Sequence, residues 1–313
     1  MPEIFGGNGA AVTVRGTQSF VNVMSSVWQR SSLAVLEILW RWMVGAPIIA
    51  LVFLEAQHVA RHVTLNTAAL EAMTVFQPVA AFQTIDAAMA VLVPAVRPIM
   101  LWLLPAAAAA WLLVAAFGRT LVLRRLDCSL QARPLALLLL GTLRASVLAS
   151  VWMLWLGLFM QAGKIAISGP AAHGGEPDIV LYAAILICGS LLLYVVWAIV
   201  SWPLHLAPLL AMQQNLGSWA ALCAAIRSTA VRGKLIEVNL VMHIVKIAAL
   251  VLALVFSASP LPFTSVETQT FLNAWWSGVL LLYFAASDYF HVVRSAAYIS
   301  LWRSFDPPAV QQR

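Results

Sequence analysis

The side chains of this sequence that could do chemistry are ionisable groups set within long apolar runs. Glu37 and Arg41 stand four residues apart, so their charged groups can pair if this run is a helix. Asp288 lies in a later apolar run, and His291 follows it by one helical turn. An ionisable group within a lipid-embedded helix is costly and usually faces the interior of a helix bundle. We expect the pair of Glu37 and Arg41 to be structural and to lie near the cytoplasmic headgroups, and Asp288 to lie toward the cytoplasmic side of its span.

A second group of polar residues suggests an anion site. Asn239, His243 and Lys246 fall on one helical face over two turns, and Arg144 reaches a similar depth in another apolar run. In one interpretation the cations extend toward the headgroups, while Asp288 forms a salt bridge that fixes helix packing. In the other, an anionic headgroup or solute is bound, and the predicted ligands are Arg144, Lys246, His243 and Asp288.

The sequence carries no signature of an enzyme. A Gly-x-Ser-x-Gly elbow, a His-Glu-x-x-His pair, a phosphate loop and a Cys-x-x-Cys pair are all missing. Only Asp288 with His291 resembles an acid–base pair, so we expect a non-enzymatic protein without a cofactor. Glu55, His58 and His62 share one helical face and have the ligand types that Zn²⁺ and Cu²⁺ prefer. A solvated helix end explains these three residues more simply, and we predict no metal site.

The composition is typical of a membrane protein. Hydrophobic residues make up 62% of the chain and charged residues only 10%. A soluble domain of this length could not cover its surface with so few charges. The formal net charge is +6, but the basic residues are scattered at the ends of apolar runs and form no patch with interleaved aromatics. We therefore expect the lipid bilayer as the partner and exclude nucleic acid.

Apolar runs long enough to cross the hydrocarbon core, which takes about 20 residues, occur six times. The expected spans are 34–56, 93–117, 135–160, 179–203, 236–257 and 272–296. Such long, uniformly apolar runs indicate helices, so the predicted fold is an all-α bundle of six transmembrane helices. Lys and Arg concentrate in alternate connectors, between the second and third and between the fourth and fifth spans, which places both termini in the cytoplasm at the inner (plasma) membrane.

The segments outside the spans have their own predicted roles. We expect one membrane domain at 33–297, with an N-terminal tail at 1–32 and a C-terminal tail at 298–313. The N-terminal tail should hold an interfacial helix near residues 18–30. The segment 57–92 is expected to be a helical segment on the outer face. After a break at Pro78, the spacing of Phe82, Ile85, Met89 and Leu92 predicts an amphipathic helix.

The connector between the fourth and fifth spans predicts a short helix over 218–232. At about 1.5 Å per residue this helix is too short to cross a bilayer, so we expect it in the cytoplasmic interface. Ser218 is predicted to cap it and Gly233 to end it. A face that runs from Trp219 to Ala230 is expected to be apolar. The residues predicted to contact anionic headgroups or a cytoplasmic protein partner are Trp219, Arg227, Arg232 and Lys234.

This connector also resembles a known group of proteins. The stretch "LAPLLAMQQNLGSWAALCAAIRSTAVRGKL" has Ala207–Leu209, then Gly217 with Trp219, then Arg227 with Ser228 and Arg232 with Gly233. It is similar to the cytoplasmic segment of bacterial six-span proteins related to the membrane domain of glycerophosphodiester phosphodiesterases. Where that group has an activity, it belongs to a separate soluble domain with acidic metal ligands, which we do not expect here. The resemblance therefore implies a membrane architecture and no activity.

Two functions stay open from the sequence. The first is a non-enzymatic membrane protein that acts as a scaffold, binds lipid or serves as an accessory subunit. The second is a transport permease subunit that works with a separate ATPase, which would dock on a cytoplasmic connector at 118–134 or 213–234.

Overall fold

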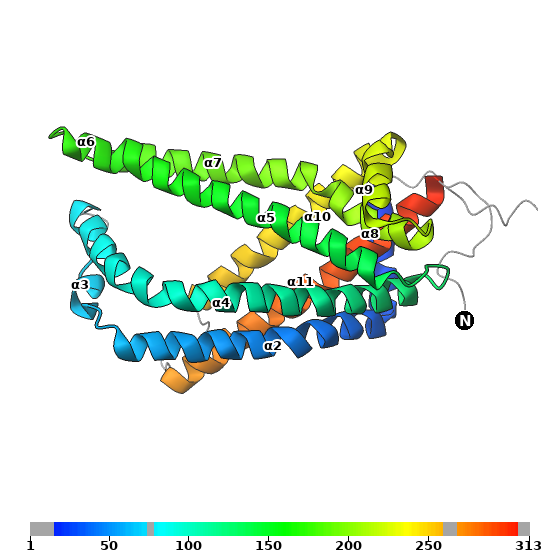
Figure 1. Cartoon of the computed structure of the whole chain (residues 1–313), viewed down its shortest axis with the longest axis horizontal. Coiled ribbons are helices and arrows are strands. Elements are labelled where there is room, and N and C mark those ends of the chain that lie inside the picture. Colours follow the sequence, from blue (N-terminus) through cyan, green and yellow to red (C-terminus); the bar gives the residue numbers. More distant parts are fainter. Residues whose placement is uncertain (1–15, 74–77, 259–267, 306–313) are drawn as a thin grey trace, which may run out of the picture. The chain divides into compact units, whose positions relative to one another are not determined.

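The computed structural model describes residues 16–73, 78–258 and 268–305 (Figure 1). Within these ranges the regular structure is helical throughout, with no strand, which confirms the predicted all-α fold. The helices are α1 (Gly16–Gln29), α2 (Ser31–His62), α3 (Thr67–Glu71), α4 (Pro78–Leu126), α5 (Pro134–Gly163), the π-helical turn η1 (Lys164–Ser168), α6 (Gly169–Ala172), α7 (Ile179–Val200), α8 (Trp202–Gln213), α9 (Ser218–Arg227), α10 (Thr229–Ala258) and α11 (Gln269–Phe305).

Five helical stretches among the described residues are long and apolar enough to cross a membrane. They are Ser31–His62, Gln83–Leu126, Pro134–Ala172, Ile179–Gln213 and Thr229–Ala258. These stretches contain the first five expected spans and confirm a multi-pass architecture. The sixth expected span, 272–296, lies within α11, which is long enough at 37 residues. Polar residues such as Asn273 and Asp288 dilute its apolar character, so its crossing stays a prediction.

The long helices carry large apolar side chains on their outer faces. Leu104 of α4, Met153 of α5, Leu192 of α7 and Leu254 of α10 are each at least 60% exposed. In water such a surface would be an aggregation liability, whereas in a bilayer it is the face that contacts acyl chains. The side chains therefore agree with the lipid surroundings that the composition indicates.

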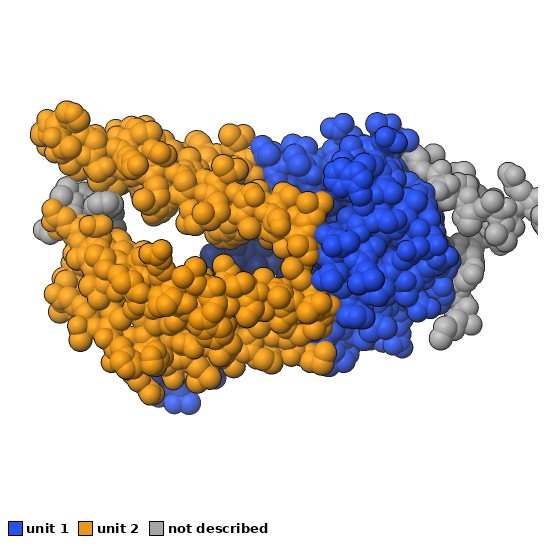
Figure 2. All heavy atoms as spheres, viewed as in Figure 1, with its two compact units in different colours: residues 1–41, 116–141, 195–313 blue, residues 42–115, 142–194 orange. Residues whose placement is uncertain are grey.

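The chain divides into two compact units, coloured separately in Figure 2. The first comprises residues 1–41, 116–141 and 195–313, and the second comprises residues 42–115 and 142–194. The first unit holds most of the buried side chains, and α8 lies in its core, where Leu206, Leu210 and Met212 are fully buried. Helix α8 packs on α9 and α10, while α11 packs on α1 and α10.

Polar contacts fix several of the packed elements in the first unit. Asn239 of α10 is fully buried and donates hydrogen bonds to the Ala198 carbonyl at 2.6 Å and to Ser201 Oγ at 2.8 Å. The phenol of Tyr289 on α11 donates to the Met24 carbonyl of α1 at 2.9 Å. These bonds satisfy polar groups that would otherwise be costly in an apolar interior.

The two basic connectors of the sequence meet in the first unit. Gln131 N, in the α4–α5 connector, donates to the Met212 carbonyl at the end of α8 at 3.0 Å. Arg133 Nη2 donates to the Asn215 carbonyl at 3.0 Å. Asn215 has φ of 56°, a left-handed conformation that Asn tolerates better than most residues and that turns the chain from α8 into α9. Arg303, near the end of α11, pairs with Asp127 of the same connector at 2.6 Å.

The structure corrects the predicted helix at 218–232. Helix α9 ends at Arg227, Ser228 caps it, and α10 starts at Thr229, so Gly233 lies inside α10. Gly217 rather than Ser218 is the N-cap, without a side-chain hydrogen bond. The face that α9 buries against the protein is formed by Ala221, Leu222 and Ala225, whereas Trp219 and Ile226 of the predicted apolar face are exposed. Small alanines allow the close contact with α8 that the larger Trp219 would prevent.

The segments predicted to flank the membrane domain also differ from expectation. The outer segment 57–92 holds the end of α2, the short α3 and the first turns of α4, which begins at Pro78. The amphipathic helix predicted after Pro78 is not a separate element, because α4 continues through Pro94, Pro98 and Pro105. The predicted C-terminal tail begins as buried helix, since Tyr298 and Trp302 of α11 are in the core of the first unit. The N-terminal helix predicted near 18–30 is present as α1. Residues 1–15 and 306–313 of the predicted tails lie outside the described residues.

Candidate functional site

A chain of buried charges joins α2 to α11 in the first unit. Arg41 Nη2 lies 2.6 Å from Glu37 Oε1, as the spacing of four residues predicts, and Arg41 Nη1 lies 2.7 Å from Asp288 Oδ1. Trp40 Nε1 donates to the other oxygen of Glu37 at 2.8 Å. Both carboxylates are buried, with Glu37 only 1% exposed. One guanidinium is therefore shared by two carboxylates and compensates only one of their two charges. Asp288 forms a salt bridge, as the first interpretation of the sequence expects, and its partner is Arg41.

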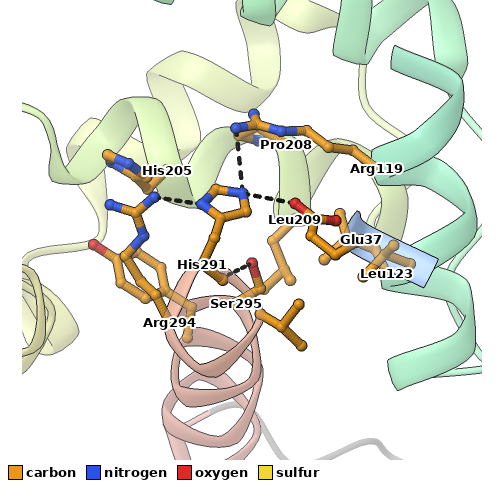
Figure 3. A pocket seen from close by; sticks show the side chains of 12 residues that line it. Glu37, Arg119, Leu123, His205, Pro208, Leu209, His291, Arg294 and Ser295 are labelled. Atoms are coloured by element: carbon orange, nitrogen blue, oxygen red, sulfur yellow. Dashed lines mark hydrogen bonds and ion pairs between the residues drawn. The ribbon is translucent and has the colours of Figure 1, made fainter. Parts of the chain in front are cut away.

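His291 lies between two further arginines, as the dashed contacts in Figure 3 show. Its Nδ1 is 2.7 Å from Arg294 Nη2, and its Nε2 is 3.4 Å from Arg119 Nη2. An arginine can only donate, so Nδ1 must accept from Arg294 and carries no proton. The ring is then neutral with its proton on Nε2, which faces Glu37 Oε1 at 3.7 Å. In this tautomer Nε2 cannot accept a hydrogen bond from Arg119.

The same residues line a cavity of about 50 Å³. Its polar wall is formed by side chains from four helices. Figure 3 shows the side chains of Arg119, Glu37 and Arg294 in contact with His291. The polar lining residues are Glu37 of α2, Arg119 of α4, His205 of α8, and His291, Arg294, Ser295 and Tyr298 of α11. Apolar side chains of Val122, Leu123 and Leu209 close the rest of the wall. The cavity thus combines cationic donors with a low-dielectric boundary.

The charges around the cavity do not balance. Arg119 and Arg294 face it, and neither has an ion pair with a carboxylate among the described residues. The one carboxylate in the wall, Glu37, is already paired with Arg41. The two lining arginines repel each other, and both also repel Arg41. Such an excess of buried positive charge is costly unless a negative group or water is supplied.

Arg119 has a donor that the described residues leave unused. Its Nε is buried and has no hydrogen-bond partner among them. Buried polar groups are nearly always hydrogen-bonded, so an orphaned guanidinium donor at a cavity wall indicates an acceptor within the cavity. Chemically, the arrangement suits the binding of an anion rather than proton transfer or nucleophilic attack.

The structure brings some of the sequence-predicted ligands near this cluster. Asp288 is buried and paired with Arg41, and His243 is buried with its Nδ1 2.6 Å from the Asn239 carbonyl. Lys246 is half-buried on α10, and its charge acts on His291. Arg144 lies in α5 and belongs to the second unit. A shared anion site that includes Arg144 therefore stays a prediction.

The weak metal candidates form no site among the described residues. The rings of His58 and His62 are neighbours, with centroids 4.4 Å apart. Glu55 does not complete a group of three His, Cys, Asp or Glu side chains with them. His62 Nδ1 is 2.7 Å from the His58 carbonyl, which is a local helix-end contact.

The predicted contact residues of the connector lie on the surface of the first unit. Trp219 is 74% exposed and Ile226, seven residues later on α9, is 55% exposed. Arg227, Arg232 and Lys234 are also exposed. We refer to these five residues as the α9 face, although Arg232 and Lys234 lie in the first turns of α10. Large apolar groups beside basic groups are what an interfacial helix presents to anionic headgroups.

The sequence did not identify Arg119 and Arg294 as site residues. Both follow apolar runs, where basic groups are typical of the cytoplasmic end of a span. A signal was available in the 3–4 spacing of Asp288, His291, Ser295 and Tyr298, which forms a polar stripe along α11. Arg119, by contrast, joins this stripe only through folding.

Comparison with known proteins adds no family. No protein-family model matches the chain, and neither a curated protein nor a solved structure matches it significantly. The resemblance of the α8–α10 segment to the membrane domain of glycerophosphodiester phosphodiesterases stays a prediction.

Proposed function

We propose that this chain is a non-enzymatic, multi-pass protein of a bacterial inner membrane that binds anionic lipid on its cytoplasmic side. The observation that carries the proposal is the α9 face, in which Trp219, Ile226 and Arg227 of α9 and Arg232 near the start of α10 are all exposed. Indole rings prefer the headgroup region, and each basic residue near an anionic membrane surface contributes about 1 kcal/mol of binding energy.

The orientation of the chain is part of the proposal. The α4–α5 connector contacts the α8–α9 turn through Gln131 and Arg133, and it contacts α11 through the pair of Asp127 and Arg303. Segments joined by direct hydrogen bonds and an ion pair must lie on one side of a membrane. Since two of them are rich in arginine, the positive-inside rule favours the cytoplasm. The described contacts support this orientation. Under the proposal, both chain termini are also cytoplasmic.

Lipid retention tests the proposal. The full-length protein, extracted from membranes that contain phosphatidylglycerol and phosphatidylethanolamine, should retain phosphatidylglycerol preferentially in native mass spectra. In the double variant R227Q/R232Q this preference should fall severalfold. The matched control is R61Q/K164Q, which removes two exposed cations from segments that we place on the other side. Equal retention by all three proteins would refute lipid binding by the α9 face.

Charge reversal at the same two arginines separates a scaffold or lipid-binding role from a permease subunit. If a nucleotide-hydrolysing partner co-purified with the tagged wild-type protein and was lost from R227E/R232E, the α9 face would be a protein-docking site. The lipid proposal would then be replaced.

A further inference from the structure

We propose that the cavity lined by Arg119, His291 and Arg294 binds a phosphate-type oxyanion. This site is separate from the α9 face and does not depend on the function proposed for that face. It is formed entirely by residues of the first unit, on α2, α4, α8 and α11.

The charge balance is the first argument. The three guanidinium groups of Arg41, Arg119 and Arg294 meet only the two carboxylates of Glu37 and Asp288, so one positive charge is left over. The two arginines that line the cavity also repel each other. Arg294 is only 4% exposed, so water cannot solvate its charge as it would on a surface. A bound anion would remove this imbalance.

The directions of the donors are the second argument. Arg294 reaches Nδ1 of His291 on one side of the ring, and Arg119 lies near Nε2 on the other side (Figure 3). Donors that come from several directions suit a tetrahedral oxyanion, which presents oxygens in all directions. A carboxylate presents its lone pairs in a single plane. Arg119 and Arg294 both line the cavity, so their guanidinium groups supply the donors, and Arg119 Nε is without a partner among the described residues.

The size of the cavity limits the ligand. A volume of about 50 Å³ is room for a few water-sized groups, since one water needs about 10–15 Å³ on this measure. One phosphate-type group fits this space, whereas a sugar phosphate or a nucleotide would need a much larger opening. The bound group is therefore either free inorganic phosphate or the terminal phosphate of a lipid whose chains stay outside.

Direct titration tests the site. Inorganic phosphate, added to the detergent-purified full-length protein at constant ionic strength, should bind in isothermal titration calorimetry and raise the thermal unfolding midpoint. Acetate at the same concentration should have a much smaller effect. If phosphate neither produces binding heat nor raises the midpoint of the wild-type protein, the proposal is wrong.

Variants assign the binding to the cavity. R119Q/R294Q should weaken phosphate binding at least tenfold, and R124Q/R125Q is the matched control, since Arg124 and Arg125 are exposed on the same helix as Arg119. If R119Q/R294Q does not fold, R119K/R294K keeps both charges but loses the planar donor forks, and it should still weaken binding several-fold. Unchanged affinity in a folded cavity variant, or an equal loss in the control, would overturn the assignment.

Native mass spectra distinguish the two sources of phosphate. The protein is reconstituted in phosphatidylcholine vesicles with added phosphatidic acid, then extracted with and without inorganic phosphate. Retained phosphatidic acid that inorganic phosphate displaces identifies a lipid headgroup as the ligand. Phosphate binding without retained phosphatidic acid identifies the free anion. Phosphatidylglycerol retention through the α9 face is measured separately, so either proposal can fail without the other.

Discussion

Arg41 of α2 and Asp288 of α11 are 247 positions apart in the sequence, yet their charged atoms lie 2.7 Å apart. Because Arg41 also pairs with Glu37, one guanidinium is shared by two buried carboxylates on two helices. Counted with Arg119 and Arg294, three guanidinium groups then meet two carboxylates, so one positive charge is left over. The arrangement that secures helix packing is thus the one that leaves the cavity with an excess of positive charge.

Removal of Arg41 should be strongly destabilising. In Arg41→Met both carboxylates stay buried without their common partner, and loss of one member of a buried pair costs about 3–5 kcal/mol. The free energy of unfolding in detergent micelles, measured with denaturant, should fall by that amount. R41M/D288N should recover part of the loss, because it removes one unpaired charge. Exposed Arg125→Met is the control and should change stability by less than about 0.5 kcal/mol. A near-wild-type stability of R41M would contradict the ion-pair description.

A side chain at Gly118 should destabilise the protein. A Cβ at this position of α4 would lie 2.8 Å from Cε2 of Trp40 and closer still to Cδ2. Gly118→Ala should therefore cost about 1–3 kcal/mol through displacement of Trp40, although Ala itself favours a helix. The comparison is Gly157→Ala in α5, where a Cβ meets nothing within 4 Å, and which should be neutral or slightly stabilising. The thermal unfolding midpoints of the two variants test this prediction. Equal midpoints would show that the contact of Gly118 with Trp40 is not tight.

Labelling of Cys128 should report the orientation of the basic connectors. Cys128 is exposed in the α4–α5 connector, so in the variant C188S/C223S a membrane-impermeant maleimide can reach it from one side only. We expect labelling in inverted vesicles and none in intact cells. In a background without native cysteines, Lys164→Cys should show the reverse pattern, because Lys164 is exposed in a segment that we place outside. Labelling of Cys128 in intact cells would invert the proposed topology.

Local sequence was a good guide where neighbouring residues decide the structure. The helices α2, α5, α7 and α10 coincide closely with expected spans, because uniformly apolar runs in lipid must satisfy their backbone within the segment. The pair of Glu37 and Arg41 follows from a spacing of four on one helix. The helix predicted over 218–232 was too long, since the chain breaks at Ser228.

Tertiary structure decided which of these helices are core and which polar residues meet. The apolar run from Ile179 to Gln213 is continuous in composition, yet its last part, α8, is buried while large side chains of α7 are exposed. Composition cannot separate these environments, because lipid and a protein core are about equally apolar. The contact of Arg119 with His291 joins residues 172 positions apart. The sequence by itself thus determined a helical, multi-pass membrane protein through short-range spacing and hydropathy. The cationic cavity arose only when packing brought four helices together.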